Sequence, residues 1–257
     1  MVSSILRLTR GLALHIESGP GGKWLRMGPG WRLDFAQIPV IMWVTLEGAP
    51  CKQTGMLVNV TEIKKVVADA LAGEDVRAES SGEVLRWARG IFCDKFKEFK
   101  VLRVRLDLHE DLSLAWEDGE KEMMEITVKY ELAASHKLVR DEWDDDKNFS
   151  VFGKCSNPAG HGHNYLIEIS LRGKPDERTG QIVGRSKVDE VVKREILEQF
   201  DHKNLNEDTD EFAEKMATVE NMSKVFWDKL IGNFGTAELT RVRVWETPRT
   251  YADYTGG

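Results

Sequence analysis

The feature that most constrains the fold is an internal repeat, in which the same turn occurs twice, 125 residues apart, in a chain of 257 residues. The run Thr54-Gly55-Met56-Leu57-Val58 corresponds to Thr179-Gly180-Gln181-Ile182-Val183. Each run follows a β-branched, apolar stretch that ends at a glycine, Gly48 or Gly173, and each precedes a helical pattern. A chain built this way is expected to fold as two similar units.

The later parts of the two halves also correspond. Ser80-Ser81-Gly82-Glu83 and Ala217-Thr218-Val219-Glu220 each place a hydroxyl residue two before a glutamate, as at the start of a helix. A final strand follows in each half, which gives the order strand, strand, helix, helix, strand. This order predicts two α+β units, each an antiparallel sheet with two helices on one face. We expect the boundary between Glu117 and Glu122, with domains at 1–121 and 122–257.

Composition excludes several classes of protein. The chain is 41% hydrophobic and 31% charged, which is typical of a globular protein, and no apolar run approaches membrane-spanning length. The net charge of −7 lies entirely within residues 122–257 and argues against general nucleic-acid binding. Three cysteines form no disulfide framework. We therefore expect a cytoplasmic protein without a membrane or nucleic-acid partner.

Histidines cluster in the second half. His161 and His163 flank Gly162 at the start of a predicted strand, where residues two apart point to the same face, and His136 lies upstream. Three histidines without a fourth protein ligand are typical of a catalytic zinc site with an open position. A hydrogen-bonded core or surface role remains the alternative for each histidine.

Other candidate catalytic residues lie nearby in the sequence. Cys155 precedes His161 by six residues across a turn, and a thiolate beside a zinc ion would have a lowered pKa and could act as a base or as a nucleophile. The alternative for Cys155 is a small buried apolar residue. Asp201 adjoins His202 and could orient its imidazole, although such a dipeptide is also common where a helix ends.

These pieces together resemble the 6-pyruvoyltetrahydropterin synthase family. The resemblance rests on motifs in a fixed order: Ala133-Ala134-Ser135-His136, Val151-Phe152-Gly153-Lys154-Cys155, His161-Gly162-His163-Asn164-Tyr165, Asp201-His202-Lys203-Asn204-Leu205, Thr218-x-Glu220-Asn221 and Val244-Trp245-Glu246-Thr247. The six-residue step from Cys155 to His161 is similar to the pyruvoyl-type synthases. The related 6-carboxytetrahydropterin synthases usually have a shorter step.

The resemblance implies a reaction and a set of roles. His136, His161 and His163 would hold Zn²⁺, which would bind the side-chain hydroxyls of 7,8-dihydroneopterin triphosphate. Proton transfers would then eliminate triphosphate and complete an internal redox isomerisation. The residues that move protons would be Cys155, Asp201 and His202, and those that bind the pterin would be Glu246 and Thr218.

The resemblance also implies the architecture. The chain would hold two tandem tunnelling-fold (T-fold) units that assemble into an antiparallel barrel with the helices outside. Family members form homo-oligomers with active sites between subunits, so we expect sites at inter-domain or inter-subunit interfaces.

The first half departs from the family pattern. The counterparts of His161, His163 and Cys155 are Ala36, Ile38 and Gly30, and the counterpart of Glu246 is Leu108. We therefore expect a degenerate, inactive copy in residues 1–121. Two alternatives for the whole chain stay open: 6-carboxytetrahydropterin synthesis for the queuosine pathway, and a noncatalytic zinc and pterin-binding protein. The cations that would bind the triphosphate cannot be named from the sequence.

Overall fold

A computed structural model of the chain describes residues 5–19, 22–27, 37–73, 76, 80–119, 122–177 and 179–257. The chain forms two compact units. The first comprises Met1–Ile126 and Lys174–Ile182, and the second comprises Thr127–Gly173 and Val183–Gly257. Among the helices of the described residues, none combines the length and the hydropathy that a membrane span requires.

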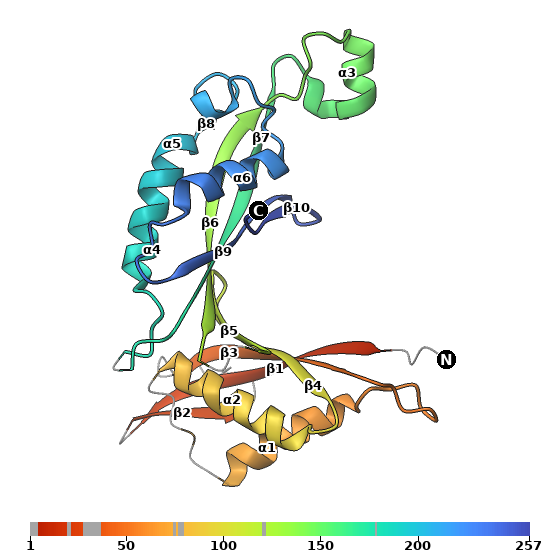
Figure 1. The fold of residues 1–257 in the computed structure, drawn as a ribbon, viewed down its shortest axis with the longest axis vertical. Coiled ribbons are helices and arrows are strands. Elements are labelled where there is room, and N and C mark those ends of the chain that lie inside the picture. Colours follow the sequence, from red (N-terminus) through yellow and green to blue (C-terminus); the bar gives the residue numbers. More distant parts are fainter. Residues whose placement is uncertain are drawn as a thin grey trace. The chain divides into compact units, whose positions relative to one another are not determined.

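The first unit is a sheet with helices on one face (Figure 1). Its strand order is β5-β4-β3-β1-β2, and neighbouring strands are antiparallel. Its elements, in chain order, are β1 (Leu6–Gly19), β2 (Gly22–Met27), β3 (Gln37–Gly48), α1 (Val60–Gly73), α2 (Ser81–Lys95), β4 (Lys100–His109) and β5 (Leu112–Glu117).

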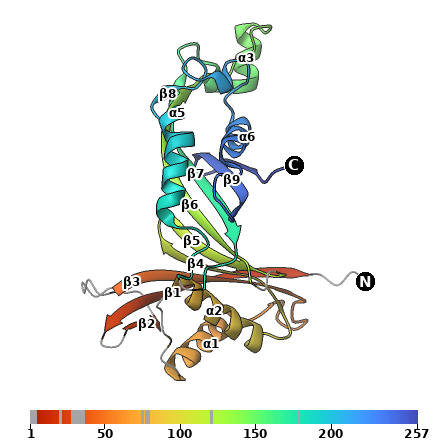
Figure 2. The same ribbon diagram turned by 60° about the vertical axis from the view of Figure 1, so that its left-hand side comes forward.

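The second unit has the same plan, with strand order β10-β9-β7-β6 and a short strand, β8, parallel to β6. Helices α4, α5 and α6 lie on one face of its sheet (Figures 1 and 2). Its elements are β6 (Met124–His136), α3 (Asp145–Phe152), β7 (His161–Gly173), α4 (Arg185–Val192), α5 (Glu198–Phe200), β8 (Lys203–Asn204), α6 (Val219–Leu230), β9 (Glu238–Thr247) and β10 (Thr250–Tyr254). Short helical turns lie at Gly153–Ser156, Lys193–Leu197 and Asp210–Phe212.

The two units repeat each other in detail. Strand β3 pairs with β4, and β7 with β9, in the same register, and each pair has a bulge at the corresponding position, Thr45/Leu46 or Ser170/Leu171. Residues along β4 and β9 alternate between buried and accessible positions in the same pattern. The predicted duplication into two α+β units with antiparallel sheets is therefore found in the structure.

The repeated turns have the same hydrogen bonds. Gly55 donates to the carbonyl of Cys51, and Gly180 donates to that of Asp176, each at 2.8 Å. Gly55 and Gly180 have φ angles of 69° and 67°, in the left-handed region where glycine lacks the steric cost of a Cβ atom. The Thr-Gly repeat in the sequence therefore reflects a backbone requirement of this turn.

The helix starts differ slightly from the sequence expectation. The N-cap of α2 is Ser80, whose side chain accepts from the backbone of Glu83 in a full capping box. The N-cap of α6 is Thr218, and the residue three positions later is Asn221 rather than a glutamate. Ser80 and Thr218 are thus the corresponding residues.

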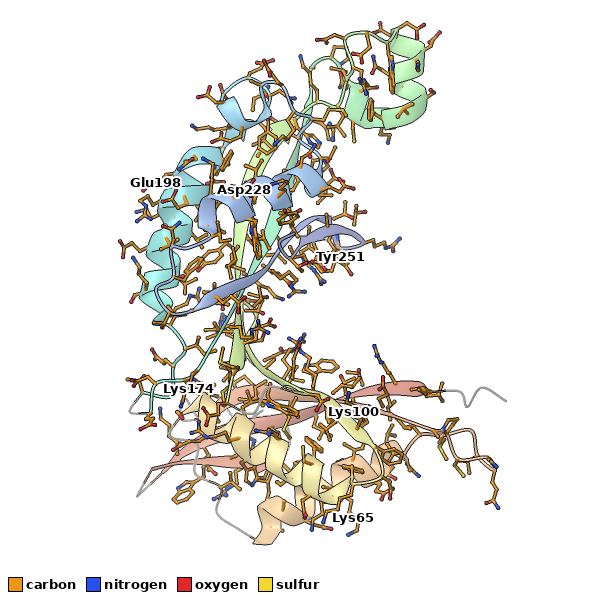
Figure 3. The ribbon with its side chains drawn as sticks, in the orientation of Figure 1. Lys65, Lys100, Lys174, Glu198, Asp228 and Tyr251 are labelled. Atoms are coloured by element: carbon orange, nitrogen blue, oxygen red, sulfur yellow. The ribbon has the colours of Figure 1, made fainter. Side chains whose placement is uncertain are left out.

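The core of the second unit lies between the sheet and its helices. Met222, Phe226 and Leu230 repeat every four residues along α6 and are fully buried. Ile167 and Ile169 of β7 are also fully buried. Charged side chains such as Glu198 and Asp228 extend from the helices at the surface (Figure 3). This packing holds β7 and β9, which carry the candidate site, in a fixed register.

Candidate metal centre

Three histidines meet where β6 ends and β7 begins. His136 is the last residue of β6, and His161 and His163 lie in the first three positions of β7, a neighbouring strand of the sheet. One nitrogen from each imidazole lies within 4.8 Å of the other two. Among the described residues, this is the single group of three or more histidine, cysteine or acidic side chains that could hold a metal ion.

The geometry of the imidazoles fits a zinc ion. The Nε2 atoms of His136 and His161 are 3.3 Å apart. Two nitrogen ligands on one tetrahedral Zn²⁺, each at about 2.0–2.1 Å, are separated by about 3.3 Å. His163 Nε2 is buried and has no hydrogen-bond partner among the described residues. The arrangement is therefore consistent with a three-histidine zinc site that leaves one position open.

A hydrogen bond at its second ring nitrogen, Nδ1, fixes the orientation of His136. Its Nδ1 lies 2.7 Å from the carbonyl oxygen of Ala217, so Nδ1 carries the proton and Nε2 is free to bind a metal. The hydroxyl of Tyr165 lies 3.3 Å from the same Nδ1. Burial lowers the pKa of His136, and this effect outweighs the bond to Ala217, so the neutral form that binds zinc is favoured.

Glu246 lies directly beside the histidines. The pairing of Leu166 with Trp245 brings the end of β9 next to the start of β7. One oxygen of Glu246 is 3.4 Å from His163 Nε2 and 3.8 Å from His136 Nε2. The carboxylate is therefore close enough to interact with a molecule that contacts the metal centre.

Cys155 is positioned by the loop that follows β6. Its carbonyl accepts a 2.7 Å hydrogen bond from the backbone of Leu138, two residues after His136. The thiol is half-buried, and its pKa is raised by burial and then by the charge of Glu246. The protein groups of this chain therefore hold Cys155 as a thiol, and the expected lowering of its pKa would need added positive charge.

Asp201 and His202 form a separate pair between α5 and β8. Asp201 accepts a 2.9 Å hydrogen bond from the backbone of Ala133, and its other oxygen is 2.9 Å from His202 Nδ1. Although burial opposes it, these contacts lower the pKa of Asp201. The side chain of His202 is 80% exposed, and within the described residues no contact joins this pair to Cys155.

His202 borders a pocket of about 590 Å³ that also has His163 and Asn164 in its wall. Thr218, the remaining predicted substrate residue, caps α6 by accepting from the backbone of Asn221 at 3.4 Å. It directly follows Ala217, whose carbonyl contacts His136. The N-terminus of α6 therefore lies beside the metal centre.

The first unit differs at the corresponding positions. Ile38 is 45% exposed and has no metal-binding atom, and Leu108 occupies the position of Glu246. The other two counterparts, Gly30 and Ala36, lie outside the described residues.

Two groups of the site were not predicted from the sequence. Tyr165 follows His163 by two residues on the same strand, so the alternation of β7 could have placed it beside the histidines. No sequence pattern could have indicated the Ala217 carbonyl, because it is a backbone group that any residue could supply and it lies 81 residues from His136.

Comparison with known proteins gives a consistent family. Residues 125–257 match the family described as "6-pyruvoyl tetrahydropterin synthase". A 6-pyruvoyl tetrahydrobiopterin synthase from Drosophila melanogaster is 37% identical over 132 residues, which are 51% of this chain and 79% of that protein. The Homo sapiens protein of the same description is 33% identical over 138 residues, covering 54% of this chain and 95% of that protein.

A solved structure of 6-pyruvoyl tetrahydropterin synthase from Caenorhabditis elegans is also similar. It is 30% identical, has a TM-score of 0.49, and the match covers 52% of this chain and 96% of that chain.

Proposed function

Because the chain belongs to the 6-pyruvoyl tetrahydropterin synthase family, we propose that it is a zinc-dependent lyase that converts 7,8-dihydroneopterin triphosphate to 6-pyruvoyltetrahydropterin and triphosphate. The observation that carries this proposal is the cluster of His136, His161 and His163 beside Glu246 and near Cys155. Histidines alone would suit many zinc proteins. The carboxylate and the thiol beside them supply groups for binding a pterin and for moving protons.

In this proposal, the residues of the second unit have separate roles in binding and in proton transfer. Bound at the three histidines, Zn²⁺ would act as a Lewis acid on the substrate's side-chain hydroxyls. Cys155 would take protons from the carbons that bear those hydroxyls. Elimination of triphosphate would turn the carbon that carried it into a methyl group and one hydroxyl-bearing carbon into a carbonyl. The other hydroxyl-bearing carbon would become a carbonyl as the ring imine is reduced, so no external oxidant is needed.

Glu246 would bind the pterin ring. An ionised carboxylate can accept two hydrogen bonds, from a ring N–H and from the exocyclic amine. Its oxygen lies 3.4 Å from His163 Nε2, so a ring held there would bring its side chain to the metal centre. Thr218 would add a hydrogen bond while it caps α6.

Asp201 and His202 would complete the proton-transfer set for a Cys155 on a neighbouring subunit. His202 is 80% exposed, and it therefore suits a contact with a second copy of the chain. We propose a homo-oligomer in which the T-fold sheets form an antiparallel barrel. Residues 122–257 would be the catalytic domain, and residues 1–121 a degenerate repeat that completes the barrel.

Substitution of Cys155 by alanine distinguishes an enzyme from a binding protein. The Cys155→Ala protein should bind zinc and neopterin like the original chain but should lose turnover of 7,8-dihydroneopterin triphosphate by at least about a hundredfold. Cys93→Ala is the matched control, because Cys93 is an exposed residue of α2 in the first unit. If both variants turn over substrate equally, Cys155 is not the base, and if the original chain has no activity, a binding role is favoured.

A further inference from the structure

Binding of a triphosphate requires positively charged side chains, but the domain proposed to bind it has no net positive charge. The substrate proposed above carries several negative charges on its phosphates, whereas residues 122–257 carry the whole net charge of −7. At physiological salt, exposed charges more than about 8 Å apart are largely screened from each other, so cations that bind the phosphates must lie close to them. Specific lysines or arginines must therefore gather near the metal centre.

One pocket of the second unit meets this requirement. It has a volume of about 840 Å³ and lies between the loop after β6, helix α3 and the start of β7. His161, a candidate metal ligand, forms part of its wall, whereas Glu246 and Cys155 do not line it. The pocket therefore adjoins the histidine cluster at His161, and its wall does not include the carboxylate proposed to bind the pterin ring.

Three cations line this pocket: Lys137, Arg140 and Lys154. The hydrogen bond between the Leu138 amide and the Cys155 carbonyl joins the two segments that carry the lysines. Lys137 directly follows the ligand His136, and Lys154 directly precedes Cys155. We propose that Lys137 and Lys154, assisted by Arg140, bind the triphosphate of the substrate, an inference that rests on the proposed function.

The two lysines are available for a ligand. Lys154 is exposed and forms no ion pair with any described residue. Lys137 is half-buried, and its nearest acidic partner, Glu207, is 4.0 Å away, a weak interaction. Each ammonium group could therefore bind a phosphate without first breaking a strong internal contact.

Arg140 has a smaller role because it already forms an ion pair with Glu142. Two acidic residues, Asp141 and Asp145, also lie in the wall of the pocket. Their negative charges repel an anion. The proposed site therefore depends on Lys137 and Lys154, which lie beside His136 and Cys155 in the sequence, rather than on residues of α3.

The outer wall of the pocket is held in shape by a buried asparagine. Asn148 is 5% exposed, accepts a 2.9 Å hydrogen bond from the backbone of Arg140 and donates to the carbonyls of Arg140 and Trp143. Trp143 also stacks on Phe152, with ring centroids 5.9 Å apart. A preformed pocket reduces the ordering cost of binding a flexible phosphate chain.

The experiment compares two nonreactive probes that differ only in phosphate. Neopterin and neopterin triphosphate are titrated against the zinc-loaded full chain, and binding is followed by pterin fluorescence. The proteins are the original chain, Lys154→Gln, Lys137→Gln and, as a matched control, Lys193→Gln, which replaces an exposed lysine that does not line the pocket. The zinc content of each sample is measured after the titration.

We expect neopterin triphosphate to bind the original chain more tightly than neopterin does. Each pocket variant should lose about tenfold in affinity for neopterin triphosphate, as expected for one charged hydrogen bond, with unchanged affinity for neopterin. Added salt should weaken binding of the triphosphate form alone. The control variant should match the original chain.

Two results would overturn the inference, and they are distinguishable. If neopterin binds but the pocket variants bind both probes like the original chain, the triphosphate site lies elsewhere and the proposed function stands. If neither probe binds the zinc-loaded original chain, the proposed function fails, and the triphosphate assignment fails with it.

Discussion

At the scale of single residues, the orientation of the histidines in the candidate metal centre is fixed by neighbouring groups. His136 is 1% exposed, and its outer nitrogen contacts a backbone carbonyl that belongs to a distant loop. Such contacts fix the tautomer and the ring orientation, and their loss commonly weakens metal binding by 10–100-fold. The Tyr165 hydroxyl is the one side-chain group that contacts the same nitrogen among the described residues.

We therefore expect Tyr165→Phe to weaken zinc binding. The hydroxyl is 3.3 Å from His136 Nδ1, a longer contact than the 2.7 Å bond to Ala217, so the zinc dissociation constant should rise by about tenfold, at the low end of such effects. Competition with a chelator measures this constant directly. Tyr251→Phe is the control, because Tyr251 is on β10 and 46% exposed (Figure 3). Equal affinities in the two variants would show that Tyr165 only fills space.

The sequence predicted the histidine cluster but not its surroundings. Two histidines separated by one residue on a strand must share a face, so His161 and His163 could be paired by periodicity alone. The closeness of Glu246 to these residues depends on the register of β7 and β9, which a single sequence does not determine. The triphosphate pocket depends on the Leu138–Cys155 hydrogen bond across a loop, a contact with no local signal.

At the scale of elements, turn and cap chemistry was predictable where one residue type is required. The glycines of the repeated turn and the hydroxyls before the helices indicated these positions. The short elements α3 and β8 were not predicted, since their stability comes from tertiary contacts such as the bonds of Asn148. The helix starts were predicted within one residue, with Ser80 rather than Ser81 as the cap.

Substitution of Ser80 by alanine should destabilise the start of α2. The change removes the hydrogen bond to the Glu83 amide, at a cost of about 1 kcal/mol. Hydrogen exchange of the peptide that covers Ser81–Lys95 should become about fivefold faster than in the original chain. Ser81→Ala, one position later, is the control and should leave the exchange rate unchanged. Similar rates in both variants would mean that the cap does not limit local opening.

The stability of the pairing between β9 and β10 should depend on pH. Arg243 contacts both oxygens of Asp253 at 2.6 and 2.7 Å, and this ion pair lowers the pKa of Asp253 below its ordinary value. A lowered carboxyl pKa contributes stability that is fully present above the unfolded-state pKa of about 3.9 and is lost as the pH falls through the folded-state pKa.

Asp253→Asn should therefore destabilise the pairing of β9 with β10 at pH 7, by about 1 kcal/mol for a partly exposed pair. Urea unfolding at pH 7 and at pH 3 measures the difference. The original chain and the variant should differ at pH 7 and converge toward pH 3. A constant difference between them at both pH values would contradict a role for the charge of Asp253.

At the scale of the whole molecule, the two units share the same strand pairing and differ in the functional side chains that they carry. Trp43 of β3 donates to Asp107 of β4, and Trp245 of β9 donates to Glu168 of β7, so the same cross-strand contact occurs with the two partners exchanged. The histidine cluster, in contrast, is found in the second unit alone among the described residues. The account therefore predicts one zinc ion per chain.

The most direct test of the central claim is mass spectrometry of the products that the zinc-loaded chain forms from 7,8-dihydroneopterin triphosphate. The account predicts 6-pyruvoyltetrahydropterin and triphosphate in equal amounts, with no product after zinc is removed and restored formation when zinc is returned. A carboxylated pterin with acetaldehyde would instead assign the chain to the 6-carboxy reaction. Unchanged substrate, with one zinc per chain verified by metal analysis, would contradict the claim that this site is a lyase.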